Sequence, residues 1–105
     1  MLAFESNDLI DQRHKSGKSY LEFLNVPDMS MGVYALKAGA TDPQSPHNED
    51  EAYYIISGCG QIRVGDEDRA VQPGSIVYVA KHVPHKFHSI TEDLQILVFF
   101  APRET

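Results

Sequence analysis

Beyond residue 17, clusters of glycine, proline, asparagine and aspartate divide the chain into short segments that carry no helical pattern. The clusters recur roughly every eight to twelve residues, a spacing typical of short strands joined by turns. Segments with the composition of strands cover residues 20–24, 31–36, 51–57, 61–64, 70–71, 75–79, 86–89 and 94–101. The series predicts an all-β fold, an antiparallel sandwich or barrel.

Glycines are expected to make several of the turns between these strands. Gly58 and Gly60 are predicted to end the strand over residues 51–57, which places Cys59 in a turn. A second turn is predicted over residues 65–68. A cysteine held in a turn, with no other cysteine in the chain, argues against a thiolate-bound structural zinc ion.

One helix is predicted near residues 7–16. Ser6 is expected to be its N-cap, and Asp8 adds a negative charge to its first turn. Basic residues precede Gly17, which suits the negative end of the helix dipole, and the glycine suits a helix stop. The all-β domain is therefore expected to begin with a short N-terminal helix.

The length of 105 residues predicts a single domain over residues 1–105, with the barrel over about 19–101. A chain of this size buries roughly two-thirds of its unfolded surface. Apolar residues make up 42% of the sequence, which is enough for a core and argues against disorder.

Composition also indicates the cellular location and argues against some classes of partner. A single cysteine cannot form an intramolecular disulfide and no secretory leader is recognised, so a cytoplasmic location is expected. The longest apolar runs, such as residues 96–101, are too short to cross a bilayer. The formal net charge of -6 argues against a nucleic-acid partner, because no basic stripe is present to neutralise phosphates.

Two histidines and a glutamate suggest a metal site. His47 and Glu51 are four residues apart, so in an extended chain their side chains point to the same face. His85 follows downstream in a segment rich in turn residues. Two imidazoles and one carboxylate on one face can bind a divalent transition metal and leave positions open for a substrate.

The spacing around His47 resembles the first motif of the cupin superfamily, whose members are small jelly-roll barrels that commonly hold a metal. That motif is Gly, five residues, His-x-His, three or four residues, Glu, six residues, Gly. Here Gly39, Ser45, His47, Glu51 and Gly58 occupy the corresponding positions. Every spacing fits, and the one replaced ligand is the first histidine, which is serine here.

The second cupin motif is Gly, five residues, Pro-x-Gly, two residues, His, three residues, Asn. Gly74 and His85 match it, whereas Ala80, His82 and Ser89 replace the proline, the second glycine and the asparagine. The two motifs and their spacer cover about half of the chain. The resemblance implies an all-β cupin jelly-roll barrel of the single-domain type, a monocupin.

The resemblance makes His47, Glu51 and His85 metal ligands, and these donors suit Fe, Mn, Ni, Co or Zn as a divalent ion. With serine in place of the first histidine, three protein ligands remain and more positions are open. Gln44 and Glu49 are nearby oxygen donors that could substitute for the missing ligand. The replacement is equally consistent with a site that has lost its metal.

Residues two apart on the ligand-bearing strands are expected to form the walls of the site. The expected substrate-lining residues are Ser45, Tyr34, Leu36, Ile55, Phe87 and Ser89. Tyr53 shares the face of Glu51, and both are candidate catalytic residues. The phenol could donate to a metal-bound oxygen, ligate the metal or accept a proton, or it could serve only as packing.

The other polar residues of the two motifs have structural interpretations. Glu49 and Asp50 are expected to be solvated loop charges. His82 is expected in a tight turn, and His88 on the outer face of its strand.

Two classes of function follow. The first is a metal-dependent enzyme that acts on a small polar or anionic metabolite, by oxygenase, isomerase or lyase chemistry. The second is a non-catalytic module that binds a small ligand or a metal. Sheet edges that need covering favour a homodimer in either case.

Overall fold

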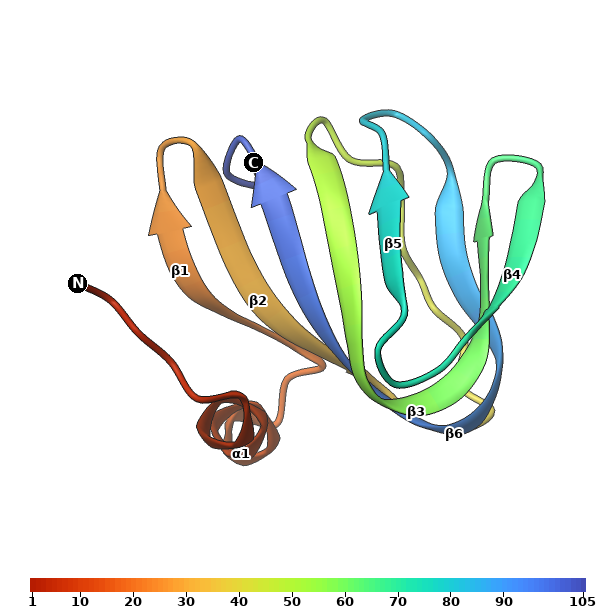
Figure 1. Cartoon of the computed structure of the whole chain (residues 1–105), viewed down its shortest axis with the longest axis horizontal. Coiled ribbons are helices and arrows are strands. Elements are labelled where there is room, and N and C mark those ends of the chain that lie inside the picture. Colours follow the sequence, from red (N-terminus) through yellow and green to blue (C-terminus); the bar gives the residue numbers. More distant parts are fainter.

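The computed structural model describes residues 1–105, and their secondary structure is almost entirely β (Figure 1). The elements are α1 (Ser6–Ser16), β1 (Tyr20–Val26), β2 (Met29–Leu36), β3 (Asp50–Val64), β4 (Glu67–Val71), β5 (Ile76–Val79) and β6 (His85–Ala101). The predicted all-β class with a short N-terminal helix is confirmed. α1, of 11 residues, is the only helix, and no helix is long and apolar enough to cross a membrane.

All strands pair antiparallel in one sheet of order β1-β2-β6-β3-β4, and β5 pairs with β3 outside this path. β3 and β6 are long and strongly curved, so the sheet folds over on itself (Figure 1). β1, β2 and the last part of β6 form one side of the fold, and β4, β5 and the first part of β6 form the other. The start of β3, the β5–β6 connection and the C-terminus lie at the same end.

The core fills the space inside the folded sheet. It is formed by alternate, inward-facing residues of the strands, namely Tyr34, Leu36, Tyr53, Ile55, Ile62, Val71, Val79, Phe87, Ile90, Leu94, Ile96, Val98 and Phe100. Tyr54, one residue beyond Tyr53, is exposed on the outer face. This alternation follows from the two-residue period of a strand that has one buried face.

The predicted turn at Gly58 and Gly60 is wrong, because β3 continues through both glycines. The pairing of β3 with β6 shifts register between Ile55 and Gln61, which marks bulges where the strand bends. Gly58 has a φ of 94°, and a Cβ there would overlap the carbonyl group of Asp93. Cys59 therefore lies inside a strand. The strand β6 also bends without ending. The predicted strands 86–89 and 94–101 are therefore both parts of β6.

Several other element boundaries differ from the predictions by one to three residues. Glu5, rather than Ser6, is the N-cap of α1, and its side chain makes no capping hydrogen bond. Gly17 ends the helix as expected, with a φ of 72° and its N–H donating to the carbonyl of His14. The predicted turn over residues 65–68 is shorter, because β4 already begins at Glu67.

Candidate metal centre

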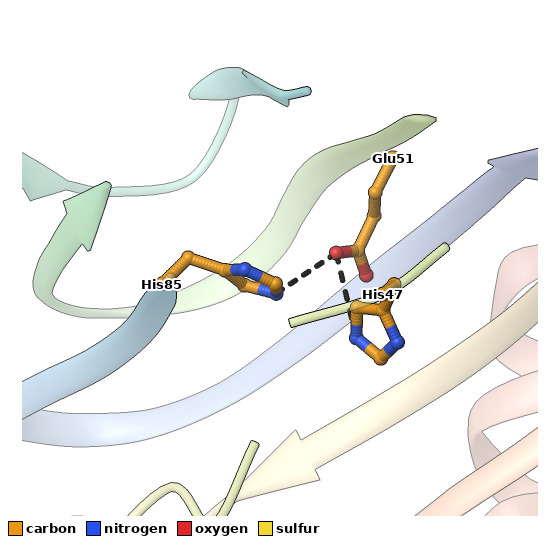
Figure 2. Close-up of side chains that lie close together, drawn as sticks. All are labelled: His47, Glu51 and His85. Carbon is orange, nitrogen blue, oxygen red and sulfur yellow. Dashed lines mark ion pairs between the residues drawn. The ribbon is translucent and has the colours of Figure 1, made fainter. Parts of the chain in front are cut away.

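The fold brings His47, Glu51 and His85 together. His47 lies in the loop before β3, Glu51 is the second residue of β3, and His85 is the first residue of β6. Their donor atoms all lie within 4.8 Å of one another, and the three side chains point toward a common centre (Figure 2). Glu51 Oε1 is 3.0 Å from His85 Nε2 and 3.8 Å from His47 Nε2.

The centre is shielded from solvent. Glu51 is 3% exposed and His85 is 6% exposed, whereas His47 is half-buried at the rim. Glu51 Oε1 is buried and has no hydrogen-bond partner, although His85 Nε2 lies 3.0 Å away. A buried carboxylate oxygen without a donor is costly, and a bound cation would offset that cost, so the environment of this atom is that of a metal ligand.

The outer nitrogens of both imidazoles face acceptors. His85 Nδ1 is 2.9 Å from the carbonyl oxygen of Val83, and His47 Nδ1 is 3.3 Å from Glu104 Oε2. An acceptor can be matched only by an N–H, so when Nε2 of each ring binds a cation, its one proton belongs on Nδ1. The two lone pairs then face inward, toward Glu51. This is the arrangement by which outer hydrogen bonds orient metal-binding histidines.

Gln44 contributes another inward-facing acceptor. Its Oε1 lies 3.2 Å from the Nε2 atoms of both His47 and His85, and accepts a hydrogen bond of 2.9 Å from the hydroxyl of Tyr53. The amide nitrogen of Gln44 donates to Asp42 Oδ2 at 2.8 Å, which fixes the orientation of the amide. The donor set therefore consists of two imidazole nitrogens, a carboxylate oxygen and an amide oxygen, which together suit a divalent transition metal.

The ionisation of the centre follows from its crowded acceptors. Burial lowers the pKa of His85, but the carboxylate of Glu51 and the carbonyl of Val83 outweigh it, so the pKa is raised. Burial and the charge of Glu51 raise the pKa of Tyr53 well above its usual value, against the opposing effect of its hydrogen bond to Gln44. Without a bound cation, the phenol of Tyr53 is thus a neutral donor.

A pocket of about 220 Å³ opens beside this centre. Its walls are Tyr20, Tyr34, Gln44, His47, Glu51, Tyr53, Val98, Phe100 and Glu104. Of the expected substrate-lining residues, the structure places only Tyr34 in this wall. Leu36, Ile55 and Phe87 are buried in the core instead.

The structure places Ser45 and Ser89 on the exposed surface, outside the pocket. Ser89 has a φ of 49°, so the two-residue alternation that would have turned it inward from His85 is interrupted. At residues 44–45 it is Gln44 whose side chain points inward. Serine in place of a ligand at position 45 therefore leaves an oxygen donor at the centre, supplied by the residue before it.

The remaining polar residues of the two motifs lie outside the centre. Glu49 is 3% exposed, which contradicts its interpretation as a solvated charge, because the C-terminal residues fold over it and Thr105 Oγ1 donates to its carboxylate. Asp50 accepts from the backbone N–H of Lys81. His82 has a φ of 67° in a turn, as expected, and His88 pairs with Asp68 away from the centre.

Four wall residues, namely Tyr20, Val98, Phe100 and Glu104, were not expected from the sequence. Tyr20 of β1 lies opposite Tyr34 of β2, so the two side chains share one face of the sheet. The sequence does not give this pairing, and it therefore could not place Tyr20 in the wall. Glu104 lies beyond the last strand, and the C-terminal residues fold back so that its backbone N–H donates to Ser30 Oγ. No local pattern in the sequence indicates that fold-back.

Known proteins similar to this chain share its fold. The cupin domain family matches residues 32–100. An uncharacterized protein of Streptomyces coelicolor is 49% identical over the full length of both chains.

Two solved structures show the extent of the structural likeness. The TT1209 protein from Thermus thermophilus has a TM-score of 0.79 at 23% identity, over 98% of this chain and 99% of its own. KdgF from Halomonas sp. has a TM-score of 0.73 at 21% identity, over 80% of this chain and 77% of its own. The family match extends over more than half of the chain, from β2 to β6, and includes all three residues of the centre, so the chain belongs to the cupin family.

Proposed function

We propose that this cupin binds a divalent transition metal through His47, Glu51 and His85 and acts on a small polar metabolite at that centre. The observation that carries the proposal is that the Nε2 atoms of both imidazoles and the Oε1 atoms of Glu51 and Gln44 face one another at a common centre. Glu51 Oε1 is buried without a hydrogen bond, and both imidazoles have acceptors at their outer nitrogens. A divalent cation would satisfy all of these atoms together.

Gln44 is proposed as the fourth donor. Its amide oxygen faces the same centre as the two histidines, and the hydrogen bond to Asp42 holds it there. Amide oxygens are weaker donors than imidazoles, so exchange of this ligand for a substrate oxygen would cost less than loss of a histidine.

The metal, when bound, supplies Lewis-acid polarisation of a substrate oxygen, or redox chemistry if it is iron. The residues of this chain position the substrate and hold the proton. Tyr53 is a neutral phenol beside the centre, so its proposed role is to donate a hydrogen bond to a substrate oxygen. To donate outward, the phenol must leave Gln44, which couples substrate binding to release of the amide oxygen. Glu51 is proposed to act as a ligand and charge balance.

A second candidate is a non-catalytic module that binds a metal or a small ligand. The observation in its favour is that Gln44 already occupies the space between the two imidazoles and Tyr53. Catalytic centres keep a position open, whereas structural centres are closed by protein ligands. If Gln44 stays bound in the presence of every ligand, the centre is closed and this second function holds.

The experiment that tests the metal centre is metal analysis of untagged protein by plasma mass spectrometry. The wild type is compared with His85→Ala and with His14→Ala, which removes a histidine from the exposed face of α1. Near-stoichiometric metal in wild type and His14→Ala, and its loss in His85→Ala, would support the centre. Wild type that stays metal-free after reconstitution with Fe, Mn, Ni, Co and Zn ions would overturn it.

The metal found directs the next assays. Iron would call for oxygen-uptake measurements, and zinc, manganese, nickel or cobalt for lyase or isomerase assays. The homodimer stays a prediction, and light scattering during size exclusion would check it.

A further inference from the structure

The pocket beside the metal centre contains no lysine or arginine. Its nine lining residues include two carboxylates, those of Glu51 and Glu104, and the only other ionisable groups are His47 and three phenols. Glu104 Oε2 lies 3.3 Å from His47 Nδ1. An anionic group deep in this pocket would therefore meet carboxylates without a basic side chain to pair with it.

The hydrogen-bonding groups of the pocket are mostly acceptors. The Tyr34 hydroxyl donates to Asp42 Oδ1 at 2.7 Å, and the Tyr53 hydroxyl donates to Gln44 Oε1 at 2.9 Å. Each hydroxyl has a single proton, so while these two hydrogen bonds are kept both oxygens offer only lone pairs to a ligand. The Tyr20 hydroxyl is buried and has no partner, so it is the one hydroxyl of the pocket whose proton is uncommitted.

The rest of the wall is aromatic. Tyr20, Tyr34, Tyr53 and Phe100 surround the pocket, and the rings of Tyr20 and Tyr34 meet edge to face with centroids 6.2 Å apart. Aromatic faces attract ammonium and other onium cations, and the attraction grows when the cation is desolvated. Aromatic walls with a carboxylate at their side suit such a group.

We propose that the pocket binds a zwitterionic ligand whose ammonium or other onium group lies among Tyr20, Tyr34 and Phe100, next to Glu104. The oxygen end of the ligand faces the His–Glu–His centre, where a divalent ion with one glutamate has a net positive charge. Only this oxygen end rests on the proposed metal function. The cation subsite is made of protein groups alone.

The first test uses two ligands of the same shape. Glycine betaine and 3,3-dimethylbutyrate both carry a carboxylate, and differ in that the first has a trimethylammonium group where the second has a neutral tert-butyl group. Titrated into zinc-reconstituted protein and followed by amide NMR shifts, betaine is expected to bind about tenfold more tightly, the ratio that about 1.4 kcal/mol of cation binding gives. Equal or tighter binding of 3,3-dimethylbutyrate would overturn the cation subsite.

The second test needs no metal. Tetramethylammonium and the neutral compound tert-butanol are titrated separately into metal-free wild-type protein. Both titrations are repeated with the variant Glu104→Gln and with the control Glu67→Gln, which changes an exposed residue of β4. Tetramethylammonium alone should shift the amides of the pocket, with at least about tenfold weaker binding in Glu104→Gln only.

The two tests separate the two proposals. Tetramethylammonium binding in a protein that takes no metal would support the cation subsite and refute the metal centre. The opposite result is metal binding without tighter binding of betaine than of 3,3-dimethylbutyrate, or of tetramethylammonium than of tert-butanol. It would support the metal centre and refute the cation subsite. The wild-type comparisons are decisive even if Glu104→Gln fails to fold.

Discussion

Glu104 Oε2 lies 3.3 Å from Nδ1 of His47, and so links the C-terminal residues to the metal centre. The carboxylate reaches this position because the chain folds back after β6, where the backbone N–H of Glu104 donates to Ser30 Oγ. A carboxylate at the outer nitrogen of a ligand histidine orients the ring and increases its basicity. His47 is the least buried of the three proposed ligands, so it depends most on such a partner.

The first prediction follows from this contact. Glu104→Ala should weaken metal binding by about 10- to 100-fold, the usual effect of losing the outer partner of a ligand histidine. Competition with a chromophoric chelator would measure the affinity. Glu67→Ala, at an exposed position, is the control and should bind metal as wild type does. An unchanged affinity in Glu104→Ala would show that His47 needs no help from the C-terminal residues.

The second prediction concerns Tyr20 and Gly32. The ring of Tyr20 lies over Gly32, where a Cβ would overlap its hydroxyl end. Gly32→Ala should therefore push the ring out of the pocket and destabilise the protein by about 1–3 kcal/mol, a typical cost of overpacking. Urea unfolding would measure the loss. Because the overlap needs the tyrosine ring, Gly32→Ala should cost much less in a Tyr20→Ala background. Equal costs in both backgrounds would mean that the ring does not cause the effect.

The strands were largely predictable because one face of the sheet is buried and the other is not. The alternation of Tyr53, Tyr54 and Ile55 marks that difference in the sequence, and the turn glycines mark most strand ends. The bends of β3 and β6 were not predictable in the same way. Gly58 looks like a turn in the sequence, and only the close approach of the Asp93 backbone shows that it is a bulge in a continuous strand.

The candidate ligands could be proposed from spacing, since His47 and Glu51 lie close in sequence and the cupin motifs supply His85. The groups around them could not. The amide of Gln44 points inward because Asp42 holds it, and Glu104 arrives from the far end of the chain. Both contacts depend on side-chain orientation and on a fold-back after the last strand, neither of which leaves a periodic pattern in the sequence.

The third prediction is a loss of stability at alkaline pH. Burial is the main cause of raised pKa values for Tyr20, Tyr34 and Tyr53, whereas tyrosines in the unfolded chain ionise near pH 10. Since the folded pKa values are higher, the unfolded state releases protons first. Their contribution is complete below about pH 10 and falls as the pH rises toward the folded values.

Unfolding by urea at several alkaline pH values would test this prediction in metal-free protein. The free energy of unfolding should fall with a slope corresponding to more than one proton per molecule. The ultraviolet signal of tyrosinate should grow in step with unfolding, apart from the fraction that the exposed Tyr54 and Tyr78 contribute. A stability that stays level while these tyrosines ionise would contradict the burial assigned to them.

The fourth prediction compares two glycines with nearly the same positive φ. Gly58 and Gly74 have φ values of 94° and 93°, and so substitution by alanine has a similar backbone cost at each, about 1–2 kcal/mol. Only at Gly58 would the new Cβ overlap a neighbour, the carbonyl group of Asp93 in β6, whereas nothing lies within 4 Å at Gly74. Gly74→Ala should thus remain folded with a modest loss, and Gly58→Ala should lose several kcal/mol more or fail to fold, because backbone cannot move aside as a side chain can. Thermal unfolding of the two variants side by side measures the difference. Similar melting temperatures would show that β3 and β6 can move apart at the bend without loss of stability. Glycine would then be needed at position 58 only for its positive φ.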